Sequence, residues 1–474
     1  MTRNEDVLVI GGGPGGYPSA IRAAQFGKSV LLVEKEHLGG MCLNWGCIPS
    51  KALISAADYY YQISNKISIM GITVKDVSID VKQLQHWKNQ IITHLINGIR
   101  QSLKNNNVKI LMGTARFLNP KQVEVVLENN KKELIEPTDT IIATGTEIIS
   151  LKGLKIDEKN ILSAKGALAL DHVPEEFLII GGGIIGLELG TVFAKLGSRV
   201  KIVEIMPQIM LGVDQSLVRV VKRNLKNLGV EIYTETQVTK VTSKDGKLEV
   251  KLDNKKIGIM TLIVDKIFAA IGFRASTKDL GLDKAGIKTD ERGFILTNTK
   301  QQTNVPHIYA VGDCTGIPFL AHKATKQGII AAEVIADKQS EAVFRAIPGA
   351  IFTDPEIAFA GMTEQEAKEA GYNIIIARAP FVASGRARIE LKTEGFVKVV
   401  IDEDRGVLLG VQIVGPHASD LISEVALALE MGATANDIAF TIHPHPTLSE
   451  MIMEAVEAAQ GKAIHIGSPK RPKR

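Results

Sequence analysis

Cys42 and Cys47 lie five positions apart in a glycine-rich stretch that runs from Gly39 to Lys51. On a straight α-helix, residues at this spacing have Cα atoms about 8.6 Å apart, whereas a disulfide requires less than about 7 Å. A bond between the two sulfurs therefore requires the backbone to leave a straight helix, and Gly46 is placed to permit this. A disulfide formed under such a constraint is easily reduced, as redox catalysis requires.

Lys51 follows Cys47 by four residues, so on a resumed helix its ammonium group shares a face with that sulfur and favours the thiolate. Two buried thiols without chemistry are the plain alternative, and the spacing alone does not decide between the two interpretations. A metal site is disfavoured, because no second Cys or His pair with zinc-ligand spacing lies nearby. We predict a redox pair and no metal.

A second group of chemically capable residues is the segment His443-Pro444-His445-Pro446. Prolines exclude a regular helix here, so we expect a loop that precedes a helix from Thr447. Glu450, five residues after His445, can turn back to hold one ring nitrogen and leave the other as a base. A pair of surface histidines is the alternative. Because a redox cysteine pair needs a proton acceptor, we favour catalysis.

The strand predicted at Val7–Ile10 leads into Gly11-x-Gly13-x-x-Gly16 and a helical stretch, and the next strand ends at Glu34. In this fingerprint of dinucleotide binding, the glycines make a tight turn and admit the pyrophosphate. The helix N-terminus faces the phosphate charge, and the acid binds ribose hydroxyls. Strand, helix and terminal acid together make the signal much stronger than the glycines alone.

The same pattern recurs 170 residues later, with Gly181-x-Gly183-x-x-Gly186 after an apolar strand and Glu204 at the end of the next one. Two such units in one chain predict two bound dinucleotides. Only one of these needs to be an exchangeable nicotinamide. The first unit leads directly into the cysteine pair and is therefore the better place for a permanently bound flavin.

The 474 residues indicate two to four domains. With 45% hydrophobic residues, 23% charged residues and a net charge of +4, the composition is globular and shows no basic face for nucleic acid. No apolar run is long enough to span a membrane, and the N-terminus lacks a secretory pattern, so we expect a cytoplasmic protein. The basic tail Lys470–Arg474 is expected to be a solvated terminus.

The remaining elements are predicted from hydrophobic periodicity. A helix is expected over residues 80–103, with a stripe of core residues comprising Leu84, Trp87, Ile91, Leu95 and Ile99. Strands are expected near residues 108–117, 122–127, 140–143, 248–252 and 261–271. From residue 348 onward, strands at 374–381, 396–401 and 407–414 followed by helices indicate a separate α+β domain.

Asp313 closes the apolar strand Ile308–Val311. It is either a turn former or a carboxylate for the ribityl hydroxyls of a cofactor. Cys314, which follows directly, is expected to be a small buried hydrophobe.

The Gly39–Lys51 segment, the two glycine fingerprints and His445-Pro446-Thr447-Leu448-Ser449-Glu450 together resemble the pyridine nucleotide–disulfide oxidoreductases over the whole chain. The resemblance implies an α/β fold with two Rossmann-like dinucleotide-binding domains, for FAD and NAD, and a C-terminal α+β dimerisation domain. It places the first part of the FAD domain at 1–148, the NAD domain at 149–276, the central part of the FAD domain at 277–347 and the dimerisation domain at 348–474.

Cys47–Leu53 and Phe352–Glu356 are most similar to the members that act on dihydrolipoamide. The resemblance therefore implies oxidation of protein-bound dihydrolipoamide to lipoamide, with reduction of NAD+, by the E3 component of a 2-oxoacid dehydrogenase complex. That component would be a homodimer that meets the lipoyl domain and the peripheral-subunit-binding domain of the E2 component. Cys42 would exchange with the substrate, Cys47 would face the flavin, and His445 would be the base oriented by Glu450.

The resemblance also implies further site residues. Lys51 would pair with Glu188 near the flavin. The residues assigned to FAD are Gly11, Gly13, Gly16, Glu34, Lys51, Ala115, Asp313 and Ala321, and Thr144 and Gly145 are also assigned to cofactor binding. Those assigned to NAD are Gly181, Gly183, Ile185, Gly186, Glu204, Val238, Ala270 and Gly272.

Some positions depart from the usual family pattern. Met41 and Trp45 stand where the cysteine motif usually has smaller residues, and Trp45 either narrows access or fills a local gap. The segment 272–277 lacks the usual Gly-Arg-x-Pro-Asn-Thr. Two rival functions remain: a related reductase that runs in the opposite direction on another disulfide, and a flavoprotein that acts mainly as a docking subunit.

Overall fold

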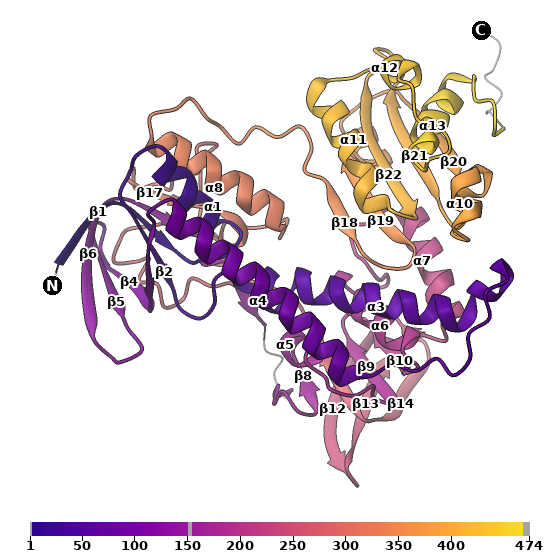
Figure 1. Ribbon diagram of the computed structural model, residues 1–474, viewed down its shortest axis with the longest axis horizontal. Helices are drawn as coiled ribbons and strands as arrows, with labels where there is room; N and C mark the ends of the chain where they lie inside the picture. The colour runs from indigo at the N-terminus through magenta and orange to yellow at the C-terminus, as the bar shows by residue number, and fades with distance from the viewer. Residues whose placement is uncertain (1, 150–153, 468–474) are drawn as a thin grey trace. The chain divides into compact units, whose positions relative to one another are not determined.

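The computed structural model describes residues 2–149 and 154–467, and the basic tail from Lys470 lies outside the described residues. The chain divides into two compact units, Met1–Val173 with Phe268–Val343, and Pro174–Ile267 with Phe344–Arg474. Each unit is therefore built from two separated stretches of the chain, as the colours of Figure 1 show.

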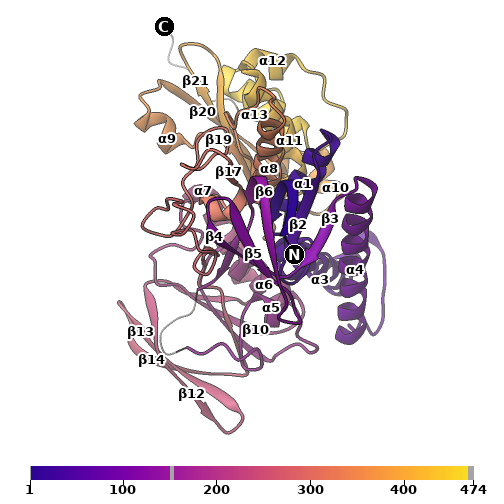
Figure 2. The same cartoon turned by 90° about the vertical axis from the view of Figure 1, so that its left-hand side faces the viewer.

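The first unit is built on a mainly parallel sheet with the strand order β3-β2-β1-β6-β5-β4, and β17 also pairs with β6 (Figure 2). Its parallel members are β1 (Thr2–Ile10), β2 (Val30–Glu34), β3 (Lys109–Met112), β6 (Lys132–Ile142) and β17 (Ile308–Ala310). The antiparallel members are β4 (Thr114–Asn119) and β5 (Gln122–Val126). Pairing of β17 with β6 explains why the segment after residue 268 belongs to this unit.

Helices cover this sheet and carry the cysteine pair. They are α1 (Gly16–Gln25), α2 (Gly40–Trp45), α3 (Cys47–Asn65), α4 (Val81–Asn105) and α8 (Ala321–Ile335). The helix α1 packs against α8 and against α4. Shorter elements of this unit are η1 (Ile67–Met70), β7 (Thr146–Ile148), β8 (Ile161–Leu162), α5 (Ala164–Ala167), β16 (Phe273–Ala275) and η2 (Gly312–Thr315).

The predicted core stripe of α4 is partly wrong. Leu84 and Leu103 are buried, but Trp87 is 40% and Leu95 is 38% exposed. The buried position next to Trp87 is Lys88, one residue and therefore about 100° further around the helix. Its ammonium group donates to the side chain of Gln85 and to Leu168 O, at 2.5 and 2.7 Å. These two acceptors make burial of a lysine possible, which an apolar pattern cannot anticipate.

The second unit begins with a smaller copy of the nucleotide-binding pattern. Its parallel strands β9 (Glu176–Ile180), β10 (Arg199–Val203) and β11 (Glu231–Tyr233) have the order β11-β10-β9. The helices α6 (Ile184–Lys195) and α7 (Gln215–Asn227) follow β9 and β10 in the chain. A three-stranded antiparallel sheet follows, made of β12 (Thr236–Lys244), β13 (Lys247–Asn254) and β14 (Gly258–Val264). The next strand, β15 (Lys266–Ala269), is not part of that sheet.

The C-terminal part of this unit is an antiparallel sheet with the order β18-β19-β22-β21-β20. The strands are β18 (Gly349–Ile351), β19 (Glu356–Gly361), β20 (Ile374–Pro380), β21 (Phe396–Asp402) and β22 (Leu408–Gly415), which confirms the α+β prediction. The helices are α9 (Glu364–Glu369), α10 (Gly385–Ile389), α11 (Ala418–Met431), α12 (Ala435–Phe440) and α13 (Glu450–Gln460), with η3 at Phe381–Ala383.

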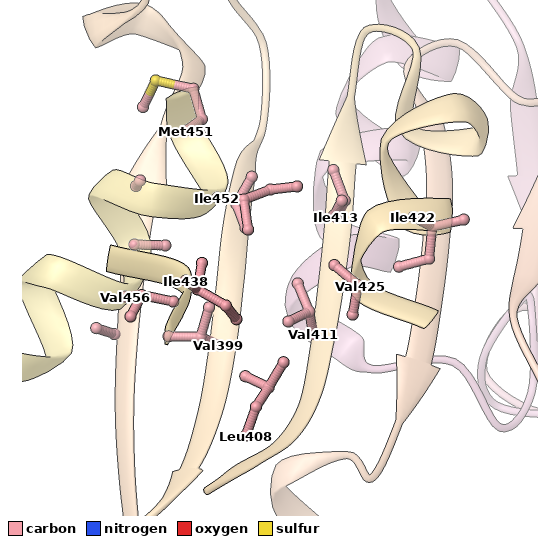
Figure 3. Close-up of a cluster of buried hydrophobic side chains, with 14 of the residues drawn as sticks. Val399, Leu408, Val411, Ile413, Ile422, Val425, Ile438, Met451, Ile452 and Val456 are labelled. Carbon is pink, nitrogen blue, oxygen red and sulfur yellow. The ribbon is translucent and has the colours of Figure 1, made fainter. Parts of the chain in front are cut away.

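One face of this antiparallel sheet forms an apolar core with the helices. Val399, Val411 and Ile413 from the strands meet Val425 of α11 and Ile452 of α13 (Figure 3). Because successive strand residues point to opposite faces, the neighbours of Val399 face the other way.

The opposite face of β21 carries a buried cation. Lys398 is 1% exposed, and its ammonium group donates to Asp214 and Glu364 at 2.7 and 2.9 Å. Asp214 also caps α7 through the backbone N–H of Ser216. Burial raises the pKa of Asp214, but the hydrogen bonds from Lys398 and Ser216 outweigh it and hold that pKa below its ordinary value. The two parts of the second unit are thus joined by an ion pair.

We predict that Lys398→Met destabilises the protein by about 3 kcal/mol, because it leaves two carboxylates without their shared cation in a largely buried place. Lys132→Met is the matched control, since Lys132 pairs with Glu124 at an exposed site and its loss should cost less than about 1 kcal/mol. The midpoint of urea denaturation measures the stability of each variant against that of the unsubstituted protein. Equal midpoints for the two variants would contradict the role of Lys398.

Candidate functional site

Cys42 and Cys47 form a disulfide with a Cα–Cα distance of 4.7 Å. The predicted departure from a straight helix is confirmed: α2 ends at Trp45, and α3 begins at Cys47 after Gly46. A Cβ added to Gly46 would lie 2.9 Å from Met41 O and 3.0 Å from Cys42 Cα. Glycine is therefore required because the backbone on both sides of the break approaches so closely.

Cys47 is the first residue of the 19-residue helix α3, which confirms that the helix resumes after the break. The N–H groups and the dipole at a helix N-terminus stabilise a thiolate there. The first turn of α3 has neither a side-chain cap nor an acidic residue that would compete for these N–H groups. Lys51 lies on the same helix one turn later, as predicted. Reduction of the disulfide thus leaves Cys47 as the sulfur better suited to negative charge.

The first glycine turn has the geometry of a nucleotide site. Gly11 N donates to Val33 O at 2.8 Å, which joins the turn to β2. The carboxylate of Glu34 accepts from Gly12 N and Glu36 N at 2.7 and 2.8 Å. These two bonds fix the carboxylate at the end of β2 and leave lone pairs for the hydroxyl groups of a ribose.

The second glycine turn repeats this arrangement atom for atom. Gly181 N donates to Val203 O at 2.8 Å. The carboxylate of Glu204 accepts from Gly182 N and Met206 N at 2.6 and 2.8 Å. The predicted repeat is therefore present in the hydrogen bonds as well as in the sequence.

The helices that follow the two turns are suited to an anion. Neither α1 nor α6 has a side-chain cap or an acidic residue in its first turn. The helices α4 and α7, by contrast, are capped by Asp80 and Asp214. An uncapped N-terminus leaves backbone N–H groups for a phosphate. The residues at both turns therefore fit a dinucleotide.

The two turns differ in what covers them. Gly39 N donates to Gly12 O at 2.8 Å, and a Cβ added to Gly40 would lie 2.7 Å from Gly13 Cα. The cysteine motif therefore lies directly over the first turn. Within the described residues, no atom lies within 4 Å of a Cβ added to Gly183. The second turn has a cover of its own, since Met210 N donates to Gly182 O at 2.9 Å, so the two turns differ in which segment lies on them and in the contact at the middle glycine.

Three more of the residues assigned to cofactor binding follow parallel strands that end at one edge of the sheet. Thr144 and Gly145 come after β6, and Asp313 comes after β17, which pairs with β6 in parallel. Ala321 begins α8. The carboxyl edge of a parallel sheet is where such folds bind nucleotides. Ala115 on β4 belongs to the buried core, and its assignment to FAD stays a prediction.

Asp313 and Cys314 occupy the short helix η2, so Asp313 does lie in a turn. Burial raises the pKa of Asp313 to about 6, and the charge of Lys323 opposes that rise. A carboxyl group with this much hydration removed is suited to a hydroxyl donor, which a ribityl chain would supply. Cys314 is fully buried, as expected, and burial raises the pKa of its thiol to about 11.

The residues assigned to NAD fall in two places. Gly181, Gly183, Ile185, Gly186, Glu204 and Val238 belong to the second unit, whereas Ala270 and Gly272 belong to the first. The assignment of Ala270 and Gly272 therefore stays a prediction. Glu188 is buried on α6 and accepts from Phe352 N at 2.9 Å. Its predicted partner Lys51 belongs to the other unit, so that pairing also stays a prediction.

The two histidines of the proline-rich loop have different environments. His445 is 79% exposed, and its Nδ1 lies 2.9 Å from the carboxylate of Glu450, as predicted. The second oxygen of Glu450 accepts from Thr447 N at 2.7 Å, which fixes the carboxylate. Because Glu450 engages Nδ1, the Nε2 atom of His445 is the one available as a base. The helix predicted from Thr447 begins slightly later, at Glu450.

His443 cannot take the same role. Its Nε2 lies 2.9 Å from Glu424, its Nδ1 lies 2.9 Å from Thr441 O, and the side chain is 4% exposed. Two acceptors on two nitrogens favour the doubly protonated ring. The hydrogen bond with Glu424 raises the pKa of His443 above its ordinary value, against the effect of burial. The sequence pattern does not separate the two histidines, because Glu424 is distant along the chain.

Trp45 has two neighbours at the edge and face of its ring, which is what filling a local gap requires, and a narrowing of access stays a prediction. The edge of its ring meets His37, with centroids 5.7 Å apart, and the ammonium group of Lys165 lies 5.0 Å from its ring centroid.

In the described ranges, no helix is long and apolar enough to cross a membrane. Nor do those ranges hold a group of three or more His, Cys, Asp or Glu residues that could bind a metal ion.

We predict that Gly46→Ala disfavours the disulfide by about 1–3 kcal/mol, because the new methyl group meets backbone atoms that cannot move aside freely. In a series of thiol–disulfide redox buffers, the variant should require more oxidising conditions to close the bond. Gly98→Ala in α4 is the control, since a Cβ added there meets no described atom within 4 Å. An unchanged redox midpoint in Gly46→Ala would refute the argument.

Comparison with known proteins agrees with this geometry. The family model "Pyridine nucleotide-disulphide oxidoreductase" matches residues 5–328, and the model of the dimerisation domain of that family matches residues 347–456. The curated dihydrolipoyl dehydrogenase of Thermus scotoductus is 44% identical over 462 residues, which cover 97% of this chain and 98% of that protein. The curated dihydrolipoyl dehydrogenase of Haloferax volcanii is 43% identical over 463 residues, 97% of each chain.

Two solved structures are also similar. LpdA from Mycobacterium tuberculosis superposes with a TM-score of 0.89 at 25% identity and covers 95% of this chain and 99% of its own. The HOCl-induced flavoprotein disulfide reductase RclA from Escherichia coli gives 0.84 at 25% identity, with the same coverage. Together with the cysteine pair and the two glycine turns, these matches show that the chain belongs to the pyridine nucleotide-disulphide oxidoreductase family.

Proposed function

We propose that the chain is a dihydrolipoyl dehydrogenase that uses FAD and NAD and oxidises protein-bound dihydrolipoamide to lipoamide. The observation that carries the proposal is the Cys42–Cys47 disulfide, held directly over a nucleotide turn that has a ribose-binding carboxylate. The full-length similarity to curated dihydrolipoyl dehydrogenases supports this choice of substrate.

The proposed chemistry begins with a dithiol exchange. One thiolate of dihydrolipoamide attacks Cys42 Sγ, the Cys42–Cys47 bond breaks, and Cys47 leaves as a thiolate at the N-terminus of α3. The second thiol then attacks the mixed disulfide and releases Cys42, so the substrate becomes a disulfide and the protein holds both electrons. His445 accepts the proton of the attacking thiol at Nε2, and Glu450 keeps the ring oriented and stabilises its charge.

The bound cofactors would regenerate the disulfide, with FAD taking up the electron pair and NAD+ accepting it as hydride. Gly11, Gly13, Gly16 and Glu34 would hold the adenine half of FAD, and Asp313 would meet its ribityl chain. Gly181, Gly183, Gly186 and Glu204 would hold NAD. Lys51 paired with Glu188 would lie near the flavin, and Cys42 would remain on the substrate side.

We further propose a homodimer that acts in the cytoplasm with the lipoyl and peripheral-subunit-binding domains of a 2-oxoacid dehydrogenase E2 component. The dimerisation domain that matches residues 347–456 supports the homodimer. The division into domains at 1–148, 149–276, 277–347 and 348–474 remains part of this proposal.

The purified holoprotein tests the function directly. It should be yellow and should form NADH from NAD+ and dihydrolipoamide, and Cys42→Ser should abolish this activity. Turnover only in the opposite direction, with another disulfide, would favour the related-reductase rival. Bound flavin without any turnover would favour the docking subunit.

We predict a preference for NAD over NADP of about a hundredfold or more in kcat/KM, because the fixed carboxylate of Glu204 would repel a 2′-phosphate. Glu204→Gln, which keeps the size of the side chain but removes its charge, should narrow that preference. Initial rates with the two nucleotides measure the ratio. Comparable kcat/KM values in the unsubstituted protein would exclude this role for Glu204.

The proposed homodimer carries a sharper prediction, because His445 and the cysteine pair belong to different units. If each active site takes its disulfide from one subunit and its base from the other, two inactive variants should complement each other. Random exchange of equal amounts of Cys42→Ser and His445→Gln makes half of the dimers mixed, each with one intact site. Activity should then recover to roughly a quarter of the unsubstituted level. Subunit exchange verified by mass, with no recovered activity, would show that each chain supplies its own base.

A further inference from the structure

The helix α13 carries three carboxylates on one face. Glu450, Glu454 and Glu457 are spaced at i, i+4 and i+7, which places them above one another on a helix. His445 binds the first, as described above. The second, Glu454, is only 3% exposed, and its Oε1 lies 2.5 Å from Nδ1 of His465. Its other oxygen is buried and has no hydrogen-bond partner among the described residues.

His465 comes from the segment that follows α13 and folds back on it. Gly461 ends the helix with a positive φ of 74°, and Lys462 N donates to Glu457 O at 2.8 Å. Ala463 and Ile466 pack against the apolar core of the C-terminal sheet and helices. These two anchors lie on either side of His465 and hold it over Glu454.

The charges on this face favour a protonated His465. Its hydrogen bond with Glu454 raises the pKa of His465 above the ordinary value, and the negative charges of Glu450 and Glu457 add to the rise. In return, His465 acts on the carboxylate that orients the base. Burial raises the pKa of Glu450, but hydrogen bonds from Thr447 and His445 and the positive charges of His445 and His465 hold it below its ordinary value.

We propose that His465 is a positioning residue for the base: it neutralises buried Glu454, and its positive charge keeps Glu450 ionised and oriented toward His445. The proposal rests on the proposed function, in which His445 is the base. It assigns a role in the reaction to the segment after α13. The charged groups concerned are Glu450, Glu454 and Glu457 on α13 and His443 and His445 on the preceding loop.

The direction in which each substitution should change the protonation of His445 follows from the charge that it removes. His465→Gln keeps a hydrogen-bond donor but removes a positive charge, so His445 should hold its proton up to a higher pH. Glu454→Gln removes a negative charge and should have the opposite effect. The double variant removes both charges and should return close to the unsubstituted protein. Interaction across about 10 Å of partly solvated protein predicts shifts of about half a pH unit.

Two measurements on the holoprotein test this. The first is the acidic limb of the kcat–pH profile for dihydrolipoamide oxidation, where a shift of this size should make His465→Gln lose about twofold at the midpoint, about threefold well below it and little at high pH. The second is the titration of His445 in protein with 13C-labelled histidine, assigned by loss of the signal in His445→Gln. The second measurement needs no turnover, so a failure of the proposed function remains distinguishable from a failure of this proposal.

His172→Gln is the matched control, since His172 forms an exposed pair with Asp171 and should leave the His445 midpoint unchanged. Opposite shifts in His465→Gln and Glu454→Gln, cancelled in the double variant, support the proposal. Unchanged midpoints, or shifts in the same direction in both single variants, would overturn the proposal. If the segment had only a structural role, the direction of the shift would not depend on whether a positive or a negative charge was removed.

Discussion

The close backbone approach at Gly46 is the constraint on which the redox centre depends. A continuous helix would keep the Cα atoms of Cys42 and Cys47 about 8.6 Å apart, but the break brings them to 4.7 Å. The same break makes Cys47 the first residue of a long helix, where the backbone stabilises a thiolate. One glycine therefore sets both the existence of the disulfide and the difference between its two sulfurs.

A second close approach joins this centre to the nucleotide fold. The glycines before Cys42 lie on the first glycine turn and can do so only because neither side carries a Cβ atom. The second turn has the same hydrogen bonds, and there Met210 N donates to Gly182 O in the place that Gly39 N takes at the first turn. Two copies of one motif are thus differentiated by the segment that packs on them: the cysteine motif lies on the first turn, and residues 209–210 lie on the second.

The C-terminal part of the chain uses burial on both faces of its sheet to fix the proposed base. One face forms the apolar core with α11 and α13, and the other holds Lys398 between two carboxylates. The helix α13, anchored by this core, carries Glu450 at its first residue. Rigid packing of α13 therefore determines where the carboxylate that orients His445 lies.

The sequence alone determined the motifs whose partners are close along the chain. The fingerprints, the break at Gly46, the pairing of Glu450 with His445 and three of the five strands of the C-terminal sheet all depend on local spacing and period, whereas β18 and β19 were not predicted. Interactions between distant segments were decided only by the tertiary structure. Lys88 is buried where the pattern predicted Trp87, because Leu168 O lies within reach of its ammonium group. Glu424 engages the second ring nitrogen of His443 and so makes it different from His445. The chain that folds back after α13 brings His465 to Glu454. Local spacing records the shape of one helix or turn, whereas a buried charge is tolerated only where the folded chain supplies a partner.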